Sequence, residues 1–151
     1  MPLVRIDLIE GRTPDQTREL ADAVHEAIVD IYRIPERDRF QTITEHPEQH
    51  IIAQDSGLRT QDSGLRTQDS GLGFERTTGV VMIHIFTQRG RSDDDKQTLY
   101  KAIHDKLAAT GLAPEDIFIG YTENGPQDWS FGHGEAQYLT GKLQVSAKRD
   151  C

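Results

Sequence analysis

The start of the chain carries the residue best suited to chemistry, a proline directly after the initiator methionine. Removal of Met1 would leave Pro2 with a free secondary amine, and the proline ring would hold that nitrogen rigidly before the strand that follows. Burial or neighbouring cations would disfavour the protonated form and bring its pKa nearer neutrality, where it could act as a general acid or base. On this dipeptide alone, an ordinary Met-Pro start remains the simpler explanation.

The histidines are weaker candidates for catalytic or metal-binding residues. His46 and His50 have the i,i+4 spacing of zinc ligands, but Pro47 lies between them and the sequence contains no evident third ligand, so we predict no metal. His25 and His104 fall within helical patterns, and we expect them on helix surfaces rather than at a catalytic centre.

The composition excludes several classes of partner. The 151 residues contain 17 Lys+Arg and 25 Asp+Glu, a net charge of −8, without a basic run that could bind nucleic acid. No stretch approaches the roughly 20 apolar residues of a membrane span. The first residues are charged too early for a signal peptide, and the single cysteine, Cys151, has no internal partner. We expect one soluble, cytoplasmic domain over residues 1–151.

A short repeat interrupts the chain. Residues 54–60 recur unchanged as 61–67, and the first five recur again as 68–72. Each copy contains Asp-Ser-Gly, which favours turns. We interpret two of the copies as an insertion into a loop, since lengthening a flexible loop costs little free energy, although a binding loop or lid is the alternative.

A longer, degenerate repeat organises the rest. Residues 3–45 align with residues 80–123, and the matched positions occur in the same order in both copies. The matches pair Gly11-Arg12-Thr13 with Gly90-Arg91-Ser92, Leu20 with Leu99, His25 with His104, Pro35-Glu36 with Pro114-Glu115 and, after a slip of one residue, Asp38 with Asp116 and Phe40 with Phe118.

The pattern in each copy predicts a strand, a helix and a second strand. Thr13 and Ser92 are expected N-caps, and the apolar residues that follow each cap recur at helical spacing. Right-handed crossovers make the two strands of each unit parallel. We therefore predict an α/β (α+β) fold in which two tandem β-α-β units, 2–46 and 80–123, form a four-stranded mixed sheet with two helices on one face. Residues 47–79 form the intervening loop, and the tail 124–151 should add short strands or a hairpin.

These features together resemble the tautomerase superfamily. Pro2 before a strand, the doubled β-α-β unit, residues 35–40 (PERDRF) and the Arg89-Gly90-Arg91 pair carry the resemblance. Within this superfamily, the tail residues 128–132 (DWSFG) and 138–141 (YLTG) resemble the malonate semialdehyde decarboxylase family.

The resemblance implies roles for particular residues. Pro2 would supply the catalytic amine, and Asp38 would keep it protonated or assist proton movement. Arg89 and Arg91 match positions that hold a substrate carboxylate, a task suited to the planar guanidinium group. Arg91 is the more secure of the two assignments, since some relatives keep only the second arginine.

The resemblance also implies an apolar substrate-binding wall, formed by Trp129, Phe131, Tyr138 and Leu143. Such a wall would weaken carboxylate solvation as carbon dioxide leaves, although packing in the core or between subunits explains the same aromatics. The implied reaction is cofactor-independent decarboxylation of malonate semialdehyde to acetaldehyde. A keto-enol tautomerase acting on phenylpyruvate-like acids, a hydratase of unsaturated 2-oxo acids and a non-catalytic binding protein remain alternatives. The resemblance further implies a homotrimer, and we expect no metal and no cofactor.

Overall fold

The structure is a computed structural model, and it describes residues 1–54 and 75–144. Its strands are β1 (Leu3–Ile9), β2 (Phe40–His46), β3 (Val81–Gln88) and β4 (Ile117–Asn124). The main helices are α1 (Pro14–Tyr32) and α2 (Asp93–Ala109). Short helical turns are η1 (Glu48–His50), η3 (Pro114–Asp116) and η4 (Pro126–Asp128), and α3 (Gln137–Thr140) is a single turn in the tail. Apart from Gln54, the short repeat lies outside the described residues.

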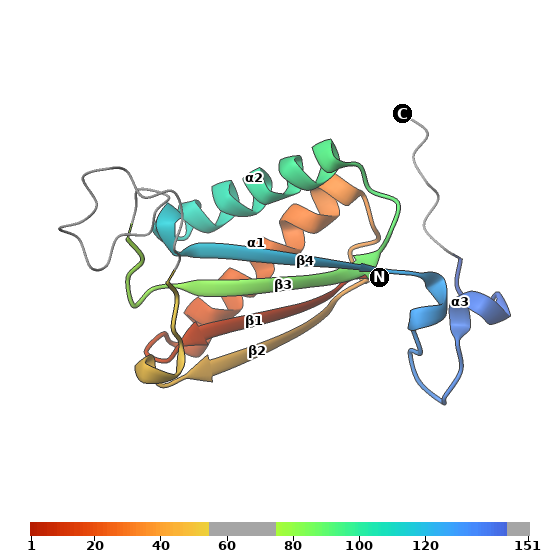
Figure 1. The fold of residues 1–151 in the computed structure, drawn as a ribbon, viewed down its shortest axis with the longest axis horizontal. Coiled ribbons are helices and arrows are strands. Elements are labelled where there is room, and N and C mark those ends of the chain that lie inside the picture. Colours follow the sequence, from red (N-terminus) through yellow and green to blue (C-terminus); the bar gives the residue numbers. More distant parts are fainter. Residues whose placement is uncertain (55–74, 145–151) are drawn as a thin grey trace.

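The four strands form one sheet in the order β2-β1-β3-β4. β1 pairs in parallel with β2, and β3 pairs in parallel with β4, while β1 and β3 pair antiparallel at the centre. This confirms the predicted mixed sheet built from two β-α-β units. Figure 1 shows both main helices on one face of the sheet, with the N-terminus at the same end as the tail.

Both helices begin with the capping boxes that the sequence predicts. The Thr13 hydroxyl accepts from the Gln16 amide (3.2 Å), and the Gln16 side chain accepts from the Thr13 amide (2.9 Å). Ser92 and Asp95 make the same reciprocal pair at the start of α2. The backbone groups that a helix start leaves unpaired are thereby satisfied within each unit.

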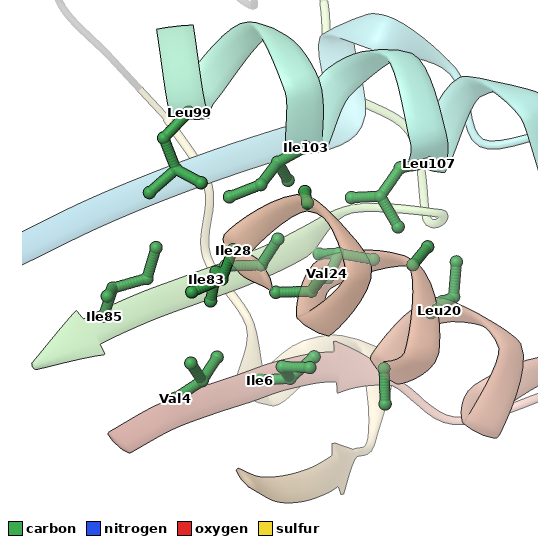
Figure 2. Packing of buried hydrophobic residues seen from close by; sticks show 14 of the residues in the cluster. Val4, Ile6, Leu20, Val24, Ile28, Ile83, Ile85, Leu99, Ile103 and Leu107 are labelled. Carbon is green, nitrogen blue, oxygen red and sulfur yellow. The ribbon is translucent and has the colours of Figure 1, made fainter. Parts of the chain in front are cut away.

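The core fills the space between the sheet and the two helices. Figure 2 shows α2 side chains directed towards α1 and the sheet, while alternate residues of β1 and β3 point towards the helices. The alternation in β1 and the helical spacing in α1 and α2 therefore predict the buried faces correctly. The fully buried side chains include Val4, Ile6, Leu8, Val24, Ile28, Ile83, Ile85, Leu99, Ile103 and Leu107.

The prediction of extra strands or a hairpin in the tail is wrong for its described part, residues 125–144. That segment consists of η4, a turn and α3. Gly132, His133 and Gly134 have φ values of 131°, 58° and 68°, which a strand does not accommodate. These consecutive positive φ values fold the chain back on itself instead of letting it pair with the sheet.

The placement of His25 on the helix surface is also wrong, because its side chain lies on the inner side of α1 and only 6% of the residue is exposed. His104 does lie partly exposed on α2, where it contacts Asp105 (2.9 Å). Within the described residues, no helix is both long and apolar enough to span a membrane.

Candidate active site

The chain's own N-terminus lies within the fold rather than in solvent. The Met1 ammonium donates a hydrogen bond to the Tyr138 hydroxyl (2.9 Å), and Pro2, the residue before β1, is buried. Burial lowers the pKa of this amine from its ordinary value, the negative charge of Asp38 raises it, and the positive charge of Arg91 lowers it. The amine therefore shares one region with Asp38, Arg91 and Tyr138, residues that are far apart in the sequence.

Asp38 lies half-buried in the connection between α1 and β2, where its backbone amide donates to the carbonyl of Pro35 (2.9 Å). Its carboxylate also acts on Tyr138. Burial is the main cause that raises the pKa of the Tyr138 hydroxyl, Asp38 adds to the rise, and Gln88 opposes it. The predicted association of Asp38 with the N-terminal amine thus fits the geometry.

Gln88 is a site residue that the sequence did not reveal. It is the last residue of β3, and its side chain interacts with the Tyr138 hydroxyl and lowers the pKa of that group, but its buried amide nitrogen Nε2 makes no well-aligned hydrogen bond among the described residues. An unpaired buried donor is unfavourable unless a ligand or water completes it. The position of Gln88 directly before Arg89 was the available signal, because both follow the same strand to the same end of the sheet.

The two predicted arginines differ in their surroundings. Arg89 is exposed, and its backbone amide donates to the carbonyl of Asn124 (2.8 Å). The Arg91 guanidinium lies 4.2 Å from the centre of the Tyr32 ring, a cation-π geometry. The Tyr32 hydroxyl lies 3.0 Å from that of Tyr121. Arg91 therefore already has an aromatic partner and influences the amine through its charge, and Tyr32 is a neighbour that the sequence patterns did not single out.

The predicted aromatic wall exists as a stack. The Trp129 and Phe131 rings are nearly parallel with centres 5.5 Å apart, and the edge of Phe131 meets Tyr138 at 5.4 Å. Phe40 lies on the other side of Phe131 at 5.8 Å. Leu143, the fourth predicted member, is half-buried after α3, and only a backbone hydrogen bond to Gln137 (3.1 Å) places it near Tyr138.

The Trp129 indole is anchored to the sheet. Its Nε1 donates to the Asn124 side chain at the end of β4 (2.7 Å), and the Phe131 backbone amide donates to Gln137 (2.9 Å). These bonds fold the tail over the end of the sheet where the N-terminus lies. The apolar wall is thus part of the same region as the amine.

A cavity of about 350 Å³ lies at the opposite end of the sheet, where β1 ends and β3 begins. Its arginine and its buried aspartate are already paired. Arg12 donates to the Gly79 carbonyl (2.7 Å), and the buried Asp116 carboxylate accepts from the Thr77 amide (2.7 Å) and hydroxyl (2.5 Å). Gly79 lies within the chain and has no free amine, so this cavity lacks the group that makes the first region reactive.

Comparisons with known proteins find tautomerases. A family model described as a tautomerase enzyme matches residues 38–132, and a second model with the same description matches residues 2–61. The probable tautomerase YrdN of Bacillus subtilis (strain 168) is 40% identical over 144 residues, which are 95% of this chain and 100% of YrdN.

Solved structures give the same family. The chain is 48% identical to FG41 malonate semialdehyde decarboxylase inhibited by 3-bromopropiolate, with a TM-score of 0.82 over 95% of this chain and 98% of the other. A second malonate semialdehyde decarboxylase, described with decarboxylase and hydratase activities, is 34% identical with a TM-score of 0.80 over 93% and 98% of the two chains. A fused 4-OT, described as a symmetric trimer, is 16% identical (TM-score 0.69, 92% and 98% covered) and shares the fold.

The opposing effects of burial and Asp38 on the N-terminal amine lead to a prediction. Asp38→Asn removes the negative charge that stabilises the protonated amine, so the pKa of the N-terminal amine, whether carried by Met1 or by Pro2 after Met1 is removed, should be lower than in the wild-type protein. The measurement is the pH dependence of acylation of the N-terminus, followed by peptide mass. Asp105→Asn, at an exposed site on α2, is the control and should leave that pKa unchanged. A rise in the pKa for Asp38→Asn would contradict the arrangement.

Proposed function

The chain belongs to the tautomerase family of enzymes, and on that premise we propose that it decarboxylates malonate semialdehyde (3-oxopropanoate) to acetaldehyde and carbon dioxide without a cofactor. The observation that carries the proposal is the burial of the N-terminal amine against Tyr138, beside Asp38 and under an aromatic stack. The likeness to two malonate semialdehyde decarboxylases over nearly the whole chain supports the choice of substrate.

Removal of Met1 makes Pro2 the terminal residue and transfers the free amine to the proline nitrogen. Met1 now lies half-buried between Pro2 and the Tyr138 hydroxyl, with which its ammonium forms a hydrogen bond. Its departure would leave the Tyr138 hydroxyl without this partner, next to the new terminal amine. We propose that the substrate takes the place of Met1.

In the reaction, the bond between the carboxylate carbon and the neighbouring CH₂ breaks, and carbon dioxide leaves. The electron pair passes towards the aldehyde oxygen as an enolate, which then takes up a proton at carbon to give acetaldehyde. A protonated Pro2 amine would stabilise the charge on that oxygen through a hydrogen bond. Alternatively, the neutral amine would add to the aldehyde carbon, and loss of water would give an iminium ion that acts as the electron sink. The charge of Asp38 raises the pKa of the Met1 amine, and we expect it to act in the same direction on the Pro2 nitrogen one residue away.

The surrounding groups fit the other needs of this reaction. The Trp129 and Phe131 stack offers little solvation to a carboxylate, which favours loss of its charge as carbon dioxide. The buried Gln88 Nε2, which has no well-aligned hydrogen bond beside Tyr138, would donate to a substrate oxygen. Arg91 would add positive charge, and the exposed Arg89 would guide or contact the carboxylate from the solvent side.

A keto-enol tautomerase is the second candidate. Burial is the largest influence on the N-terminal amine and lowers its pKa, which favours a neutral amine able to abstract a proton next to a carbonyl. The naming of YrdN as a probable tautomerase points the same way. The two activities differ in the protonation state of one nitrogen, and the same residues serve both.

We expect the purified enzyme to convert malonate semialdehyde faster than it tautomerises phenylpyruvate, and we expect its intact mass to lack Met1. Both substrates are assayed in parallel on one preparation, with acetaldehyde as the product measured for the first. Pro2→Ala still permits removal of Met1 but replaces the rigid secondary amine with a primary one, so kcat should fall about 100-fold.

Pro14→Ala is the matched control, because Pro14 is an exposed residue at the start of α1, and its activity should be unchanged. Retention of Met1 in an active preparation would overturn every mechanism that uses the Pro2 amine. Faster turnover of phenylpyruvate than of malonate semialdehyde would favour the tautomerase.

Gln88→Leu should lower the activity of the enzyme without lowering its stability. Leucine removes a buried donor without a well-aligned hydrogen bond, so the denaturation midpoint should stay the same or rise, whereas loss of a hydrogen bond to substrate should lower kcat/KM by about 10-fold. Chemical denaturation and steady-state kinetics measure the two effects. Gln97→Leu, at an exposed position of α2, is the control for both. A variant that loses stability and keeps full activity would exclude this role.

We further propose a homotrimer. The face of the sheet opposite the helices presents aromatic side chains, with Phe40 45% and Phe118 48% exposed, and Leu3, Met82 and Phe86 accompany them on this face by strand register. Such a surface favours association between chains. The fused 4-OT, which has the same fold and is described as a trimer, supports an assembly of three subunits.

Sedimentation equilibrium should give a mass three times that of the 17.0 kDa chain. Phe118→Arg should dissociate the assembly, since a charge on a buried contact face is unfavourable. Lys101→Glu, at an exposed position on α2 away from this face, should leave the trimer intact. A monomeric wild-type protein would contradict the assignment.

A further inference from the structure

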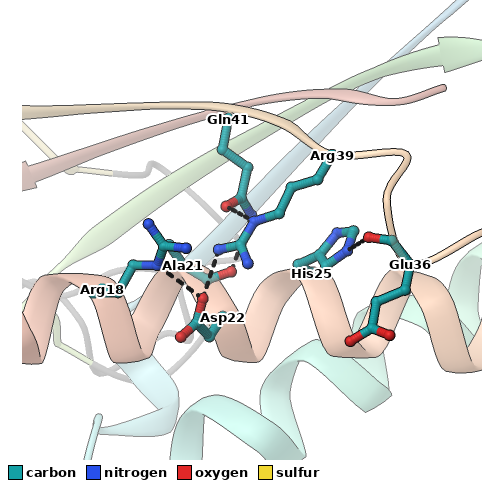
Figure 3. Close-up of polar contacts among 7 residues, drawn as sticks. All are labelled: Arg18, Ala21, Asp22, His25, Glu36, Arg39 and Gln41. Atoms are coloured by element: carbon teal, nitrogen blue, oxygen red, sulfur yellow. Dashed lines mark hydrogen bonds and ion pairs between the residues drawn. The ribbon is translucent and has the colours of Figure 1, made fainter.

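The segment that carries Asp38 is anchored to α1 by side chains on both sides of it. Before Asp38, the ring nitrogen Nε2 of His25 lies 2.7 Å from the backbone oxygen of Glu36 (Figure 3). A carbonyl oxygen only accepts hydrogen bonds, so Nε2 must carry the proton and donate it. His25 is 6% exposed and Glu36 is exposed, so the bond is partly buried, with its donor on the inner side.

After Asp38, the Arg39 guanidinium binds α1 as well. Its Nη2 lies 2.7 Å from the Asp22 carboxylate, and its Nε donates to the Gln41 side chain (2.8 Å). Gln41 in turn donates to the Ala21 carbonyl (2.9 Å), and Figure 3 shows these contacts as one group above α1. The next residue along the chain from Asp38 is therefore fixed to the same helix.

Between these anchors the backbone is tightly turned. The Asp38 amide donates to Pro35 (2.9 Å), and the Arg39 amide donates to Arg37 (2.9 Å). With Glu36 held at one side and Arg39 at the other, the Asp38 backbone has little freedom. The anchors differ in strength, because Asp22 and Arg39 have side chains that are 43% and 25% exposed, and solvent weakens such an ion pair. The partly buried His25 bond is the more effective constraint.

We propose that His25 is a positioning residue, which holds the Glu36 carbonyl so that the Asp38 carboxylate stays beside the N-terminal amine. This inference rests on the proposed function for its kinetic consequences, whereas the anchoring itself is independent of which reaction the amine performs. His25 does not touch the amine and acts only through the segment that carries Asp38.

The second β-α-β unit provides an internal comparison. His104 occupies the position that matches His25, but its side chain is 42% exposed and contacts only its neighbour Asp105 in the described interactions. Asp116, which matches Asp38, is fixed directly by Thr77 through its carboxylate. Of the two units, only the first therefore has a buried histidine that holds the turn before its aspartate, and this aspartate is the one near the terminal amine.

The experiment compares His25→Leu, His25→Gln and His104→Leu in the full-length enzyme. Leucine removes the donor, so Asp38 should move away from the amine, kcat should fall about 10-fold, and the change in KM should be smaller. The pKa of the amine should also fall, because Asp38 is the group that raises it, against the lowering effects of burial and Arg91.

The pH–rate profile shows that shift for either activity. A reaction that needs the protonated amine would lose rate at a lower pH than wild type, and one that needs the neutral amine would gain rate at a lower pH. Glutamine can donate from its own Nε2 and should restore most of the rate and of the pKa, whereas His104→Leu should match wild type in both. A purely structural role for His25 would lower the fraction of folded enzyme and leave the pKa in place.

A double-mutant cycle keeps the test decisive if His25→Leu is unstable. In an Asp38→Asn background, His25→Leu should cause no further shift in the amine pKa, which is measured by acylation of the N-terminus and needs no turnover. An unchanged pKa in the single His25→Leu variant, or an equal shift in both backgrounds, would overturn the positioning role. Absence of both activities from the wild-type enzyme would instead refute the proposed function. The acylation measurement would still test whether His25 positions Asp38, because it needs no turnover.

Discussion

The antiparallel pairing of β1 with β3 determines where this protein can perform chemistry. Pairing of Leu3 with Phe86 brings the start of the chain beside the end of β3, which continues into Gln88 and Arg89. The parallel pairing within the first unit sets Leu3 opposite Phe40, so the residues just before β2, including Asp38, reach the same end of the sheet. An amine, a carboxylate and an amide donor from distant parts of the sequence converge because three strand ends coincide.

The same pairing creates a second convergence at the other end of the sheet. There Arg12 follows β1, Asp116 precedes β4 and Gly79 stands before β3. Duplication of the β-α-β unit repeats the arginine and the aspartate, but a chain has only one N-terminus. Without an amine to act on, Arg12 and Asp116 are paired with Gly79 and Thr77. The two ends thus have related residues, and only one has the reactive group.

Local signals were enough to predict most of the fold from the sequence. The capping pairs Thr13 with Gln16 and Ser92 with Asp95 depend on residues three positions apart, and the strand alternation depends on nearest neighbours. The tail was mispredicted because consecutive positive φ values from Gly132 to Gly134 reverse its direction, and aromatic content alone does not reveal this. Pro2, Asp38, Trp129, Phe131 and Tyr138 lie at the end of the sheet that holds the N-terminus, and their roles stay predictions.

His25 and Gln88 were missed in the sequence for a different reason. His25 is buried because the chain returns over α1 eleven residues later, and Gln88 is part of the site because the tail brings Tyr138 to the end of β3. Neither environment is encoded by neighbouring residues, so periodicity cannot detect it.

Burial and Asp38 act on the N-terminal amine in opposite directions, and this balance gives the missed residues their importance. Burial is fixed by the packing of the whole sheet end, whereas the effect of Asp38 depends on its distance from the amine. A small displacement of one turn would therefore change the protonation state of the nitrogen while the core remained intact. Because a protonated amine suits decarboxylation through an enolate and a neutral one suits proton abstraction, under the proposed function the contacts that hold this turn against α1 would influence which reaction the site favours. Selectivity between the two chemistries can then reside in residues such as His25 that never meet the substrate.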